Sequence, residues 1–379
     1  ARVRIIDLQG RELGRVDNPG KLGDLAWSPD GAHLAIISAA DENDPREGRL
    51  TVVGSTGGVQ RDLLPGLQGH VWSVAWQDPR TLLYVSHEGV QARLGAIGVD
   101  GSGDRTLIAA EGPVWTSISA SANGELALVG HAPQHPAEVF HLAAGQEQAR
   151  RLTDSNPWLA SVRLARQEVV RYTARDGLEL EGVLVHPLER RGAERVPLIL
   201  VVHGGPESHY SNGWLTAYAQ PAQHAAARGF ASFFPNYRAS TGRGVEFSKL
   251  DYGRPGMEQF DDLVDGVDHL VETGLVDRGR VGITGGSYGG YASAWGATWY
   301  SERFAAAVMF VGISDQASLV TSGDIPWEQY LVHMGTWPWE NPEMFRQASP
   351  VTHAAKSRTP TLILHGEDDP RVPVGQSYM

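Results

Sequence analysis

Two patterns of apolar and polar positions divide the 379 residues of the chain. Over residues 1–165, short stretches alternate apolar and polar residues, and turn-forming pairs such as Asp30-Gly31 and Asn123-Gly124 separate them. Alternation with a period of two predicts half-buried β-strands, and these pairs supply the positive φ angles of tight hairpins. The first part of the chain is therefore predicted to consist of antiparallel hairpins.

These hairpins recur regularly along the chain. Units that begin at Arg2, Leu50, Leu94 and Val139 start about 44 to 48 residues apart, and a second strand-turn-strand unit lies between them. Four strands per period are typical of a β-propeller blade, and a closed propeller needs about four to eight blades. Residues 1–165 are thus predicted to form a partial β-propeller of about three blades plus a trailing hairpin. Four tryptophans are expected to pack between blades: Trp27, Trp72, Trp76 and Trp115.

The pattern changes in residues 166–379. Nearly continuous apolar strands, such as those that begin at Pro197 and Thr359, alternate with segments of helical periodicity near 217–228 and 257–273. Such alternation is typical of a mostly parallel sheet with helices on both faces. This part is predicted to be an α/β domain that is incomplete at its C-terminal end.

The candidate nucleophile is Ser287. An apolar strand at 281–284 runs into a G-x-S-x-G turn, and an Ala-rich helical segment follows. A serine on such a turn is exposed at the edge of an α/β-hydrolase sheet, and the N–H of the next residue, Tyr288, points to where an oxyanion forms. The alternative is a chance match in a chain with 45 glycines, which the flanking strand and helix argue against.

A second glycine-rich loop, His203-Gly204-Gly205-Pro206, ends another apolar strand. Such a loop can aim a second backbone N–H at the oxyanion, and Gly205 is favoured over Gly204 for this role. The alternative is a plain glycine turn. His203 is interpreted as a structural or pocket-lining residue and not as a base.

The triad acid is expected in the loop after the strand that ends at Leu364, where Asp368 and Asp369 compete for the role. A carboxylate there fixes the tautomer of the catalytic histidine. None of the residues after Asp369 is a histidine, so the triad histidine is expected beyond Met379. A metal site is not expected here, because no histidine pair with ligand spacing lies nearby.

Three further features have two interpretations each. The acidic residues of the segment 257–273 are interpreted as a solvated helix face. The polar loop 236–242 either lines the substrate site or is structural, because ligands bind at the carboxyl ends of such strands. Four aromatic residues form either a pocket wall or a helical cap: Trp327, Tyr330, Trp337 and Trp339.

Composition limits the classes of function. The chain is 41% hydrophobic and 20% charged, as in globular proteins, and its net charge of −12 is spread along it, which disfavours a nucleic-acid partner. No apolar run reaches the roughly 20 residues that a membrane span needs. The absence of cysteine excludes disulfides and thiolate metal sites and fits a cytoplasmic location. No cofactor or metal is expected.

The motifs HGGP, NYRASTGRG, GGSYGGY and HGEDDPRVP follow one another behind propeller repeats. In this the chain resembles the prolyl oligopeptidase family of serine peptidases, and within it the acylaminoacyl-peptidase branch. The resemblance implies an α/β-hydrolase domain capped by a propeller that admits short peptides. By motif, Ser287 matches the nucleophile, Asp369 the triad acid, and Gly205 and Tyr288 the oxyanion donors. The family's histidine is missing and the propeller is too short.

The resemblance implies a serine peptidase that works through an acyl-enzyme and releases N-acylated amino acids from short peptides. A dipeptidyl-peptidase, oligopeptidase or carboxylesterase of the same fold is the alternative. A dipeptidyl-peptidase needs acidic residues that bind a free α-amine, and the sequence reveals no such pair. A non-catalytic propeller scaffold is the alternative from another class. Whether the chain forms a homo-oligomer is left open.

Overall fold

The computed structural model describes all 379 residues, and they divide into two compact units. The first unit comprises Ala1–Val162 together with two short later segments, Ser211–Trp214 and Thr241–Lys249. The second unit comprises Arg163–Tyr210, Leu215–Ser240 and Leu250–Met379. Two segments from the second half of the chain are therefore part of the first unit.

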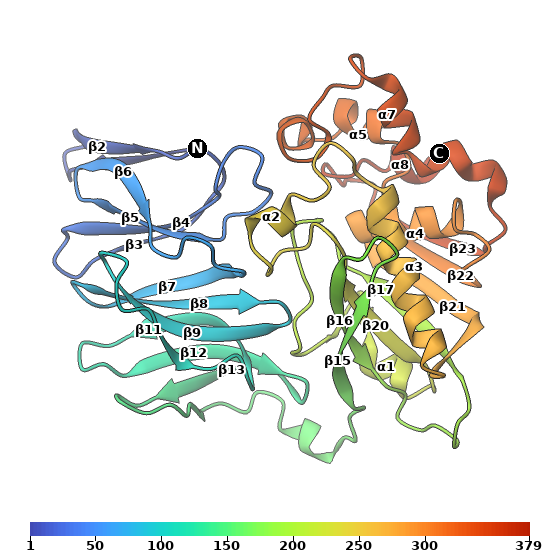
Figure 1. Ribbon diagram of the computed structural model, residues 1–379, viewed down its shortest axis with the longest axis horizontal. Coiled ribbons are helices and arrows are strands. Elements are labelled where there is room, and N and C mark those ends of the chain that lie inside the picture. The colour runs from blue at the N-terminus through green and yellow to red at the C-terminus, as the bar shows by residue number, and fades with distance from the viewer. The chain divides into compact units, whose positions relative to one another are not determined.

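The first unit is built from antiparallel sheets (Figure 1). Its strands are β1 (Arg2–Ile6), β2 (Glu12–Asp17), β3 (Leu22–Trp27), β4 (His33–Ser38), β5 (Arg49–Gly54), β6 (Gly57–Asp62), β7 (His70–Asp78), β8 (Thr81–Glu88), β9 (Gln91–Gly98), β10 (Arg105–Ile108), β11 (Val114–Ala120), β12 (Leu126–Ala132), β13 (His135–Leu142) and β14 (Arg150–Arg151). A helix in this unit, α2, spans Val245–Ser248, and the 3₁₀ segment η1 spans Pro157–Ser161.

Each of the groups β3–β6, β7–β10 and β11–β14 forms a four-stranded antiparallel meander, which is a propeller blade. The unit is a partial β-propeller of three blades, as predicted. The extra hairpin is β1–β2, which joins the first blade at β6. It precedes the blades, so the predicted position of a trailing hairpin is wrong. The reason is that each blade begins at β3, β7 or β11, which makes the last hairpin part of the third blade.

Apolar side chains from neighbouring blades form the cores of this unit. Trp76 and Tyr84 pack with residues of the first blade, and Trp76 Nε1 donates to the Ala26 carbonyl at 2.9 Å. Trp115 is buried between the second and third blades. Trp27 and Trp72 are 47% and 38% exposed, so the prediction that all four tryptophans pack between blades is wrong for these two. The pairing of β7 shifts register at Trp72, and such a bulge changes the direction of a side chain.

The second unit contains a seven-stranded sheet with the order β15-β16-β20-β17-β21-β22-β23. Its strands, with the small hairpin β18–β19, are β15 (Gln167–Thr173), β16 (Glu179–Val185), β17 (Val196–Val202), β18 (Thr216–Ala217), β19 (Gln220–Pro221), β20 (Ala231–Asn236), β21 (Val276–Gly286), β22 (Ala306–Phe310) and β23 (Thr361–Leu364). The strands β15 and β16 are antiparallel, and the five from β20 to β23 run parallel. This is the predicted α/β-hydrolase sheet.

Helices connect the parallel strands. They are α1 (Ala222–Ala226), α3 (Met257–Glu272), α4 (Tyr288–Ala297), α5 (Gln316–Ser322), α6 (Pro326–Glu328), α7 (Pro342–Gln347) and α8 (Gly375–Tyr378), with the π segment η2 (Gln329–Met334) and the 3₁₀ segment η3 (Pro350–Lys356). The predicted helix 217–228 is wrong in its first part, because residues 216–221 form the β18–β19 hairpin. The predicted helix 257–273 corresponds to α3.

The hand of the connections decides which face each helix covers. The connection from β17 to β20 runs one way across the sheet, whereas those from β20 to β21 and from β21 to β22 run the other way. Right-handed crossovers therefore place α1 on one face and both α3 and α4 on the opposite face (Figure 1). The carboxyl ends of the strands, where ligands of such sheets bind, remain free for loops.

A groove of about 790 Å³ follows the sheet on the side away from α4. Ile283 packs toward α4, where a Cβ on Gly296 would lie 2.8 Å from its side chain. The alternating neighbours Gly282 and Thr284 face the groove, which Val308 and Phe310 also line. The groove is thus a largely apolar feature of the sheet face, and Ser287 is not among its lining residues.

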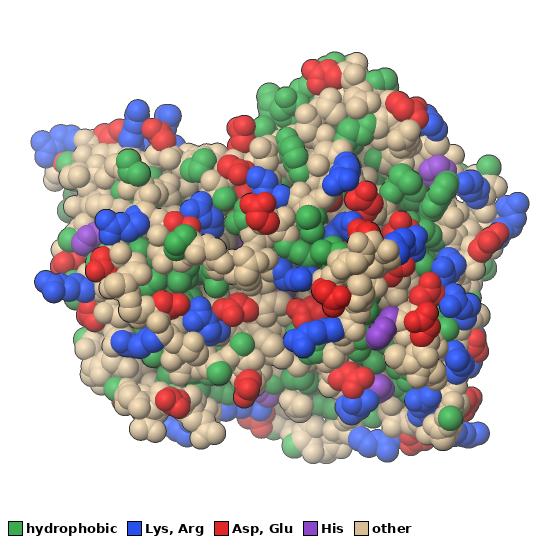
Figure 2. Space-filling view, in the orientation of Figure 1, with side chains coloured by type: hydrophobic (Ala, Val, Ile, Leu, Met, Phe, Trp, Pro, Cys, Tyr) green, Lys and Arg blue, Asp and Glu red, His purple; other side chains and the backbone are tan.

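The surface carries both signs of charge. Figure 2 shows acidic and basic side chains interspersed over the face drawn, in keeping with a net charge of −12 that is not concentrated in one segment. None of the helices is both long and apolar enough to cross a lipid bilayer.

Candidate active site

The strand β21 ends at Gly286 and α4 begins at Tyr288, so Ser287 alone makes the turn between them. Its backbone has φ 58° and ψ −119°, a conformation that side chains disfavour. A Cβ on Gly285 or Gly289 would lie 2.4 or 2.1 Å from the Val202 carbonyl oxygen, so only glycine lets this turn pack on β17. Ser287 is partly exposed, and its Oγ has no hydrogen-bond partner among the residues described.

The loop after β17 borders this turn. A Cβ built on Gly204 would lie 3.4 Å from the Ser287 Cβ and 3.8 Å from the Tyr288 nitrogen. Gly205 is exposed and has φ 116°. Tyr288 is the first residue of α4, and first-turn amides have no acceptor within their own helix. The structure therefore brings Gly204, the neighbour of Gly205, next to Ser287 and the Tyr288 nitrogen.

Asp369 follows β23, and β22 lies between β23 and the serine-bearing β21. Neighbouring strands are about 4.8 Å apart, so the two loops begin about 10 Å from each other. Asp369 Oδ1 accepts the N–H groups of Arg371 and Val372 at 2.9 and 3.0 Å. Its Oδ2 lies 3.8 Å from His365 Nε2. Asp369 and Ser287 do not touch directly, as in a triad whose histidine lies between them.

Two histidines near the site already use both ring nitrogens. His365 Nε2 lies 2.7 Å from the Val372 carbonyl oxygen, and its Nδ1 lies 2.6 Å from Ser377 Oγ. His203 contacts Gly204 O and Ser240 Oγ, and burial lowers its pKa to about 4. Neither ring is in contact with the Ser287 hydroxyl. This agrees with the interpretation of His203 as a structural residue.

A buried polar chain holds the side chain of Tyr288 in place. The Tyr288 hydroxyl donates to Gln259 Oε1, and Gln259 Nε2 donates to Asp251 Oδ2 at 2.8 Å. Burial raises the pKa of Asp251 to about 7, and the nearby Glu207 adds to the effect. The residue predicted to supply one oxyanion donor is thereby tied to α3 through its side chain.

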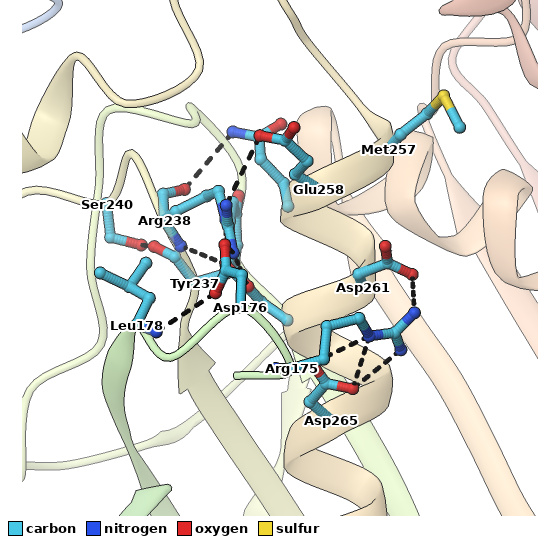
Figure 3. A network of polar contacts seen from close by, with 12 residues as sticks. Arg175, Asp176, Leu178, Tyr237, Arg238, Ser240, Met257, Glu258, Asp261 and Asp265 are labelled. Carbon is cyan, nitrogen blue, oxygen red and sulfur yellow. Dashed lines mark hydrogen bonds and ion pairs between the residues drawn. The ribbon is translucent and has the colours of Figure 1, made fainter. Parts of the chain in front are cut away.

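A second buried network holds the loop after β20 (Figure 3). Arg238 Nη2 lies 2.6 Å from Asp262 Oδ1 and 2.8 Å from Asp176 Oδ2, and Nε donates to Asp262 Oδ2 at 2.9 Å. Burial raises the pKa of Asp262 to about 6, and the Arg238 guanidinium opposes this shift. The pair is therefore ionised at pH 7, and it ties the loop to α3.

The acidic residues of α3 are not a simple solvated face, which corrects the sequence interpretation. Asp262 is fully buried against Arg238. Asp261 and Asp265 both bind Arg175, as Figure 3 shows, at 2.7 and 2.8 Å. The helical pattern alone did not reveal this, because the arginines come from β-strand ends and loops elsewhere in the chain.

The structure also shows the surroundings of the polar loop 236–242 and of the aromatic cluster, for which the sequence left two interpretations each. In the polar loop, Asn236 accepts from and donates to the backbone of Tyr210, which makes this residue a structural brace. In the aromatic cluster, Trp337 stacks on Tyr330 and on Trp339, with ring centroids 4.5 and 5.1 Å apart. Trp339 itself is exposed.

One group has the chemistry of metal ligands: Glu207, Glu328 and His333 place their ligating atoms within 4.8 Å of one another. His333 is buried, and its Nε2 lies 3.9 Å from Glu207 Oε2. Its ring also stacks on Tyr288, the neighbour of the nucleophile. The sequence analysis missed this group because more than a hundred residues separate Glu207 from the other two, and no motif joins them.

Comparison with known proteins gives a family match over the second part of the chain. The model of the prolyl oligopeptidase family matches residues 216–379, the part that carries Ser287 and Asp369. A structural neighbour of the chain is an acylaminoacyl peptidase solved in complex with Z-Gly-Gly-Phe-chloromethyl ketone, with a TM-score of 0.83 and 26% identity. That match covers 98% of this chain and 57% of the neighbour.

The proteins that are similar to this chain in sequence have several activities in their names. An uncharacterized peptidase, YuxL, of Bacillus subtilis is 33% identical over 65% of this chain and 37% of its own length. The dipeptidyl aminopeptidase BIII of Pseudoxanthomonas mexicana is 34% identical over 60% of this chain and 34% of its own. The acylamino-acid-releasing enzyme of Sus scrofa is 30% identical over 55% and 29%. The chain thus spans about a third of the length of these relatives.

Proposed function

We propose that the full-length protein is a serine peptidase that hydrolyses short peptides, and that it releases N-acylated amino acids. The observation that carries the proposal is the strained turn at Ser287, with φ 58°, against which the Gly204-Gly205 loop packs. A serine hydroxyl without a hydrogen-bond partner and two backbone amides beside it are what acyl transfer requires. The acylaminoacyl peptidases among the relatives and structural neighbours support the substrate class.

The proposed reaction runs through an acyl-enzyme. Ser287 Oγ attacks the peptide carbonyl while a histidine takes its proton, and the N–H groups of Gly205 and Tyr288 bind the oxyanion. The same histidine then protonates the leaving amine, and water releases the acyl group. Asp369 fixes the tautomer of this histidine. The order Ser, acid, His places it after Asp369, and residues 370–379 contain none.

A dipeptidyl aminopeptidase is the second candidate, because the structure supplies an acidic pair that the sequence did not reveal. Glu207 and Glu328 lie close together, and Glu207 follows the oxyanion loop by two residues. Two carboxylates can bind the α-ammonium group of a free N-terminus. The dipeptidyl aminopeptidase among the relatives is in keeping with this candidate.

Chromogenic amides separate the two candidates. We expect the full-length protein to cleave an acetyl-Ala p-nitroanilide faster than the free-amine Ala-Ala p-nitroanilide. Faster cleavage of the free amine, lost in a Glu207→Gln variant, would favour the dipeptidyl activity instead. The Ser287→Ala variant should lose activity on both substrates by roughly 10⁴-fold or more.

A fluorophosphonate probe tests whether the protein is catalytic at all. We expect labelling of the full-length protein and none of Ser287→Ala. If the full-length protein stays unlabelled under conditions that label a known serine hydrolase, it is a non-catalytic propeller scaffold. A cytoplasmic location and self-association of the chain belong to the same proposal, and sedimentation of the purified protein tests the latter.

A further inference from the structure

His203 lies directly before the oxyanion loop and is only 5% exposed. Its Nδ1 is 2.8 Å from the Gly204 carbonyl oxygen. Its ring stacks on Tyr237 with centroids 4.4 Å apart and an interplanar angle of 16°, and Tyr210 packs edge-on against it at 5.4 Å. The ring is therefore held in one orientation while it contacts the backbone of the loop.

The hydrogen bonds define the protonation of this ring. A carbonyl oxygen can only accept, so Nδ1 carries the proton and donates it to Gly204. Burial lowers the pKa of His203 to about 4, which leaves the ring neutral and Nε2 an acceptor at pH 7. Nε2 lies 2.9 Å from Ser240 Oγ, which also lies 2.6 Å from the Tyr237 carbonyl oxygen. The single hydroxyl proton of Ser240 serves either acceptor.

The backbone of His203 is fixed as well. The Tyr237 hydroxyl donates to the His203 carbonyl oxygen at 3.0 Å. Tyr237 and Ser240 belong to the loop that Arg238 ties to α3 through Asp262, as Figure 3 shows for the labelled members. The loops after β17 and β20 are thus joined through one histidine.

The contact with Gly204 has a consequence for the next residue. Gly204 and Gly205 are joined by a trans peptide, in which the C=O of the first and the N–H of the second point in opposite directions. Because His203 holds the Gly204 C=O toward the buried ring, the Gly205 N–H points away from it, toward the exposed side. Gly205 N–H donates to no acceptor among the described residues. A glycine pair is otherwise free to turn this peptide over.

We propose that His203 is a positioning residue that sets the direction of the Gly205 N–H, and so builds one of the two oxyanion donors. The inference rests on the proposed function, since it concerns the same site. His203 acts through the Gly204-Gly205 peptide and does not touch the substrate or exchange a proton with it. Loss of its Nδ1–H would leave Ser287 in place and weaken only the stabilisation of the oxyanion.

Two variants of the full-length protein distinguish the roles of the two ring nitrogens of His203. Asparagine places its Nδ2 near the position of Nδ1 and can donate to Gly204, whereas glutamine reaches only toward Ser240. We expect His203→Gln to lower kcat on a p-nitrophenyl ester by roughly 10²-fold, the effect of losing one oxyanion donor, with KM nearly unchanged. His203→Asn should retain clearly more of the activity.

The matching thionoester tests the mechanism, because sulfur is a weak hydrogen-bond acceptor and gains little from an oxyanion hole. We expect His203→Gln to lower ester turnover much more than thionoester turnover. An equal loss on both substrates, or no loss on either, would overturn the inference. So would equal effects of the Asn and Gln variants.

Folding and the proposed function are checked separately. The thermal midpoint of each variant shows whether it folds. Tyr237→Phe loses the bond to the His203 carbonyl and a longer contact of 3.4 Å with Nδ1, and it should lower the ester-to-thionoester ratio by a smaller factor. An unchanged ratio in Tyr237→Phe contradicts the inference if the His203 variants do not fold. A wild-type protein that neither labels with fluorophosphonate nor turns over the ester refutes the proposed function itself.

Discussion

Two buried aspartates of the hydrolase unit, Asp262 and Asp251, each brace one half of the candidate oxyanion hole. Asp262 binds Arg238, whose loop holds His203 and so the Gly205 side of the site. Asp251 accepts from Gln259, which holds the Tyr288 side. The two carboxyl groups are similarly buried, at 0% and 5% exposure, but have different partners.

The difference shows what a buried carboxyl group needs in order to stay charged. Asp262 has a guanidinium in bidentate contact, which favours its ionised form. Burial raises the pKa of both carboxyl groups, to about 6 for Asp262 and to about 7 for Asp251, where Glu207 adds to the shift and the partner is a neutral amide. One brace is an ion pair at neutral pH, whereas the other holds a carboxyl group near its titration midpoint.

The largest expected effect comes from removing the cation of the first brace. Arg238→Ala leaves Asp262 buried without its counter-charge, and breaking such a pair costs about 3–5 kcal/mol. The loss should appear in urea unfolding of the full-length protein. A cost below about 1 kcal/mol would mean that the pair is not buried as the structure has it.

The second prediction uses pH to separate the two aspartates. Because folding raises the pKa of Asp251 from 3.8 to about 7, the folded state holds the proton more tightly. Stability should therefore fall as pH rises from about 4 to about 7. Asp262, whose pKa is raised to about 6, contributes a smaller slope of the same sign. We expect Asp251→Asn to remove the Asp251 share of the slope, so that its stability relative to wild type improves between pH 5 and pH 8 by on the order of 2 kcal/mol.

Asp262→Asn is the matched control for this pH series. Its charge is used by Arg238, so the variant should be less stable than wild type at both pH values. If both asparagine variants behave alike, the distinction between the two braces is wrong.

A smaller effect is expected at the end of the second brace. Tyr288→Phe removes the hydroxyl that donates to Gln259, and the loss of one such hydrogen bond costs about 1 kcal/mol. Because the backbone N–H of Tyr288 is proposed as an oxyanion donor, kcat should also fall while KM changes little. Tyr300→Phe removes a hydroxyl bonded to Asp261 on the outer side of α3 and should leave kcat unchanged.

The smallest effect is expected at the exposed counterpart of the Arg238 network. Arg175 binds Asp261 and Asp265 but is half exposed, so water replaces much of what is lost in Arg175→Ala. The expected cost is below about 1 kcal/mol, and it should shrink further in high salt. A cost equal to that of Arg238→Ala would show that burial is not what separates the two arginines.

Local patterns predicted much of the fold. The helix α3 and the turn at Ser287 follow from short sequences, because helical periodicity and the glycines at 285 and 289 each require one local geometry. The predicted helix 217–228 was too long, since a short hairpin replaces its first part. Trp27 and Trp72 were assigned to blade interfaces by residue type alone, although a register shift decides where Trp72 points.

The sequence by itself determined the two kinds of sheet, the strand-turn-helix at Ser287 and the loop that follows the strand at 361–364, because each depends on neighbours along the chain. Only the tertiary structure decided which polar groups are buried together. The local sequence does not distinguish Asp262 from its acidic neighbours on α3, and it does not distinguish His203 from any other histidine before a glycine loop. Their roles depend on Arg238, Tyr237 and Ser240, which the sheet order brings close to them from the end of another strand. No periodicity in the sequence predicts these contacts.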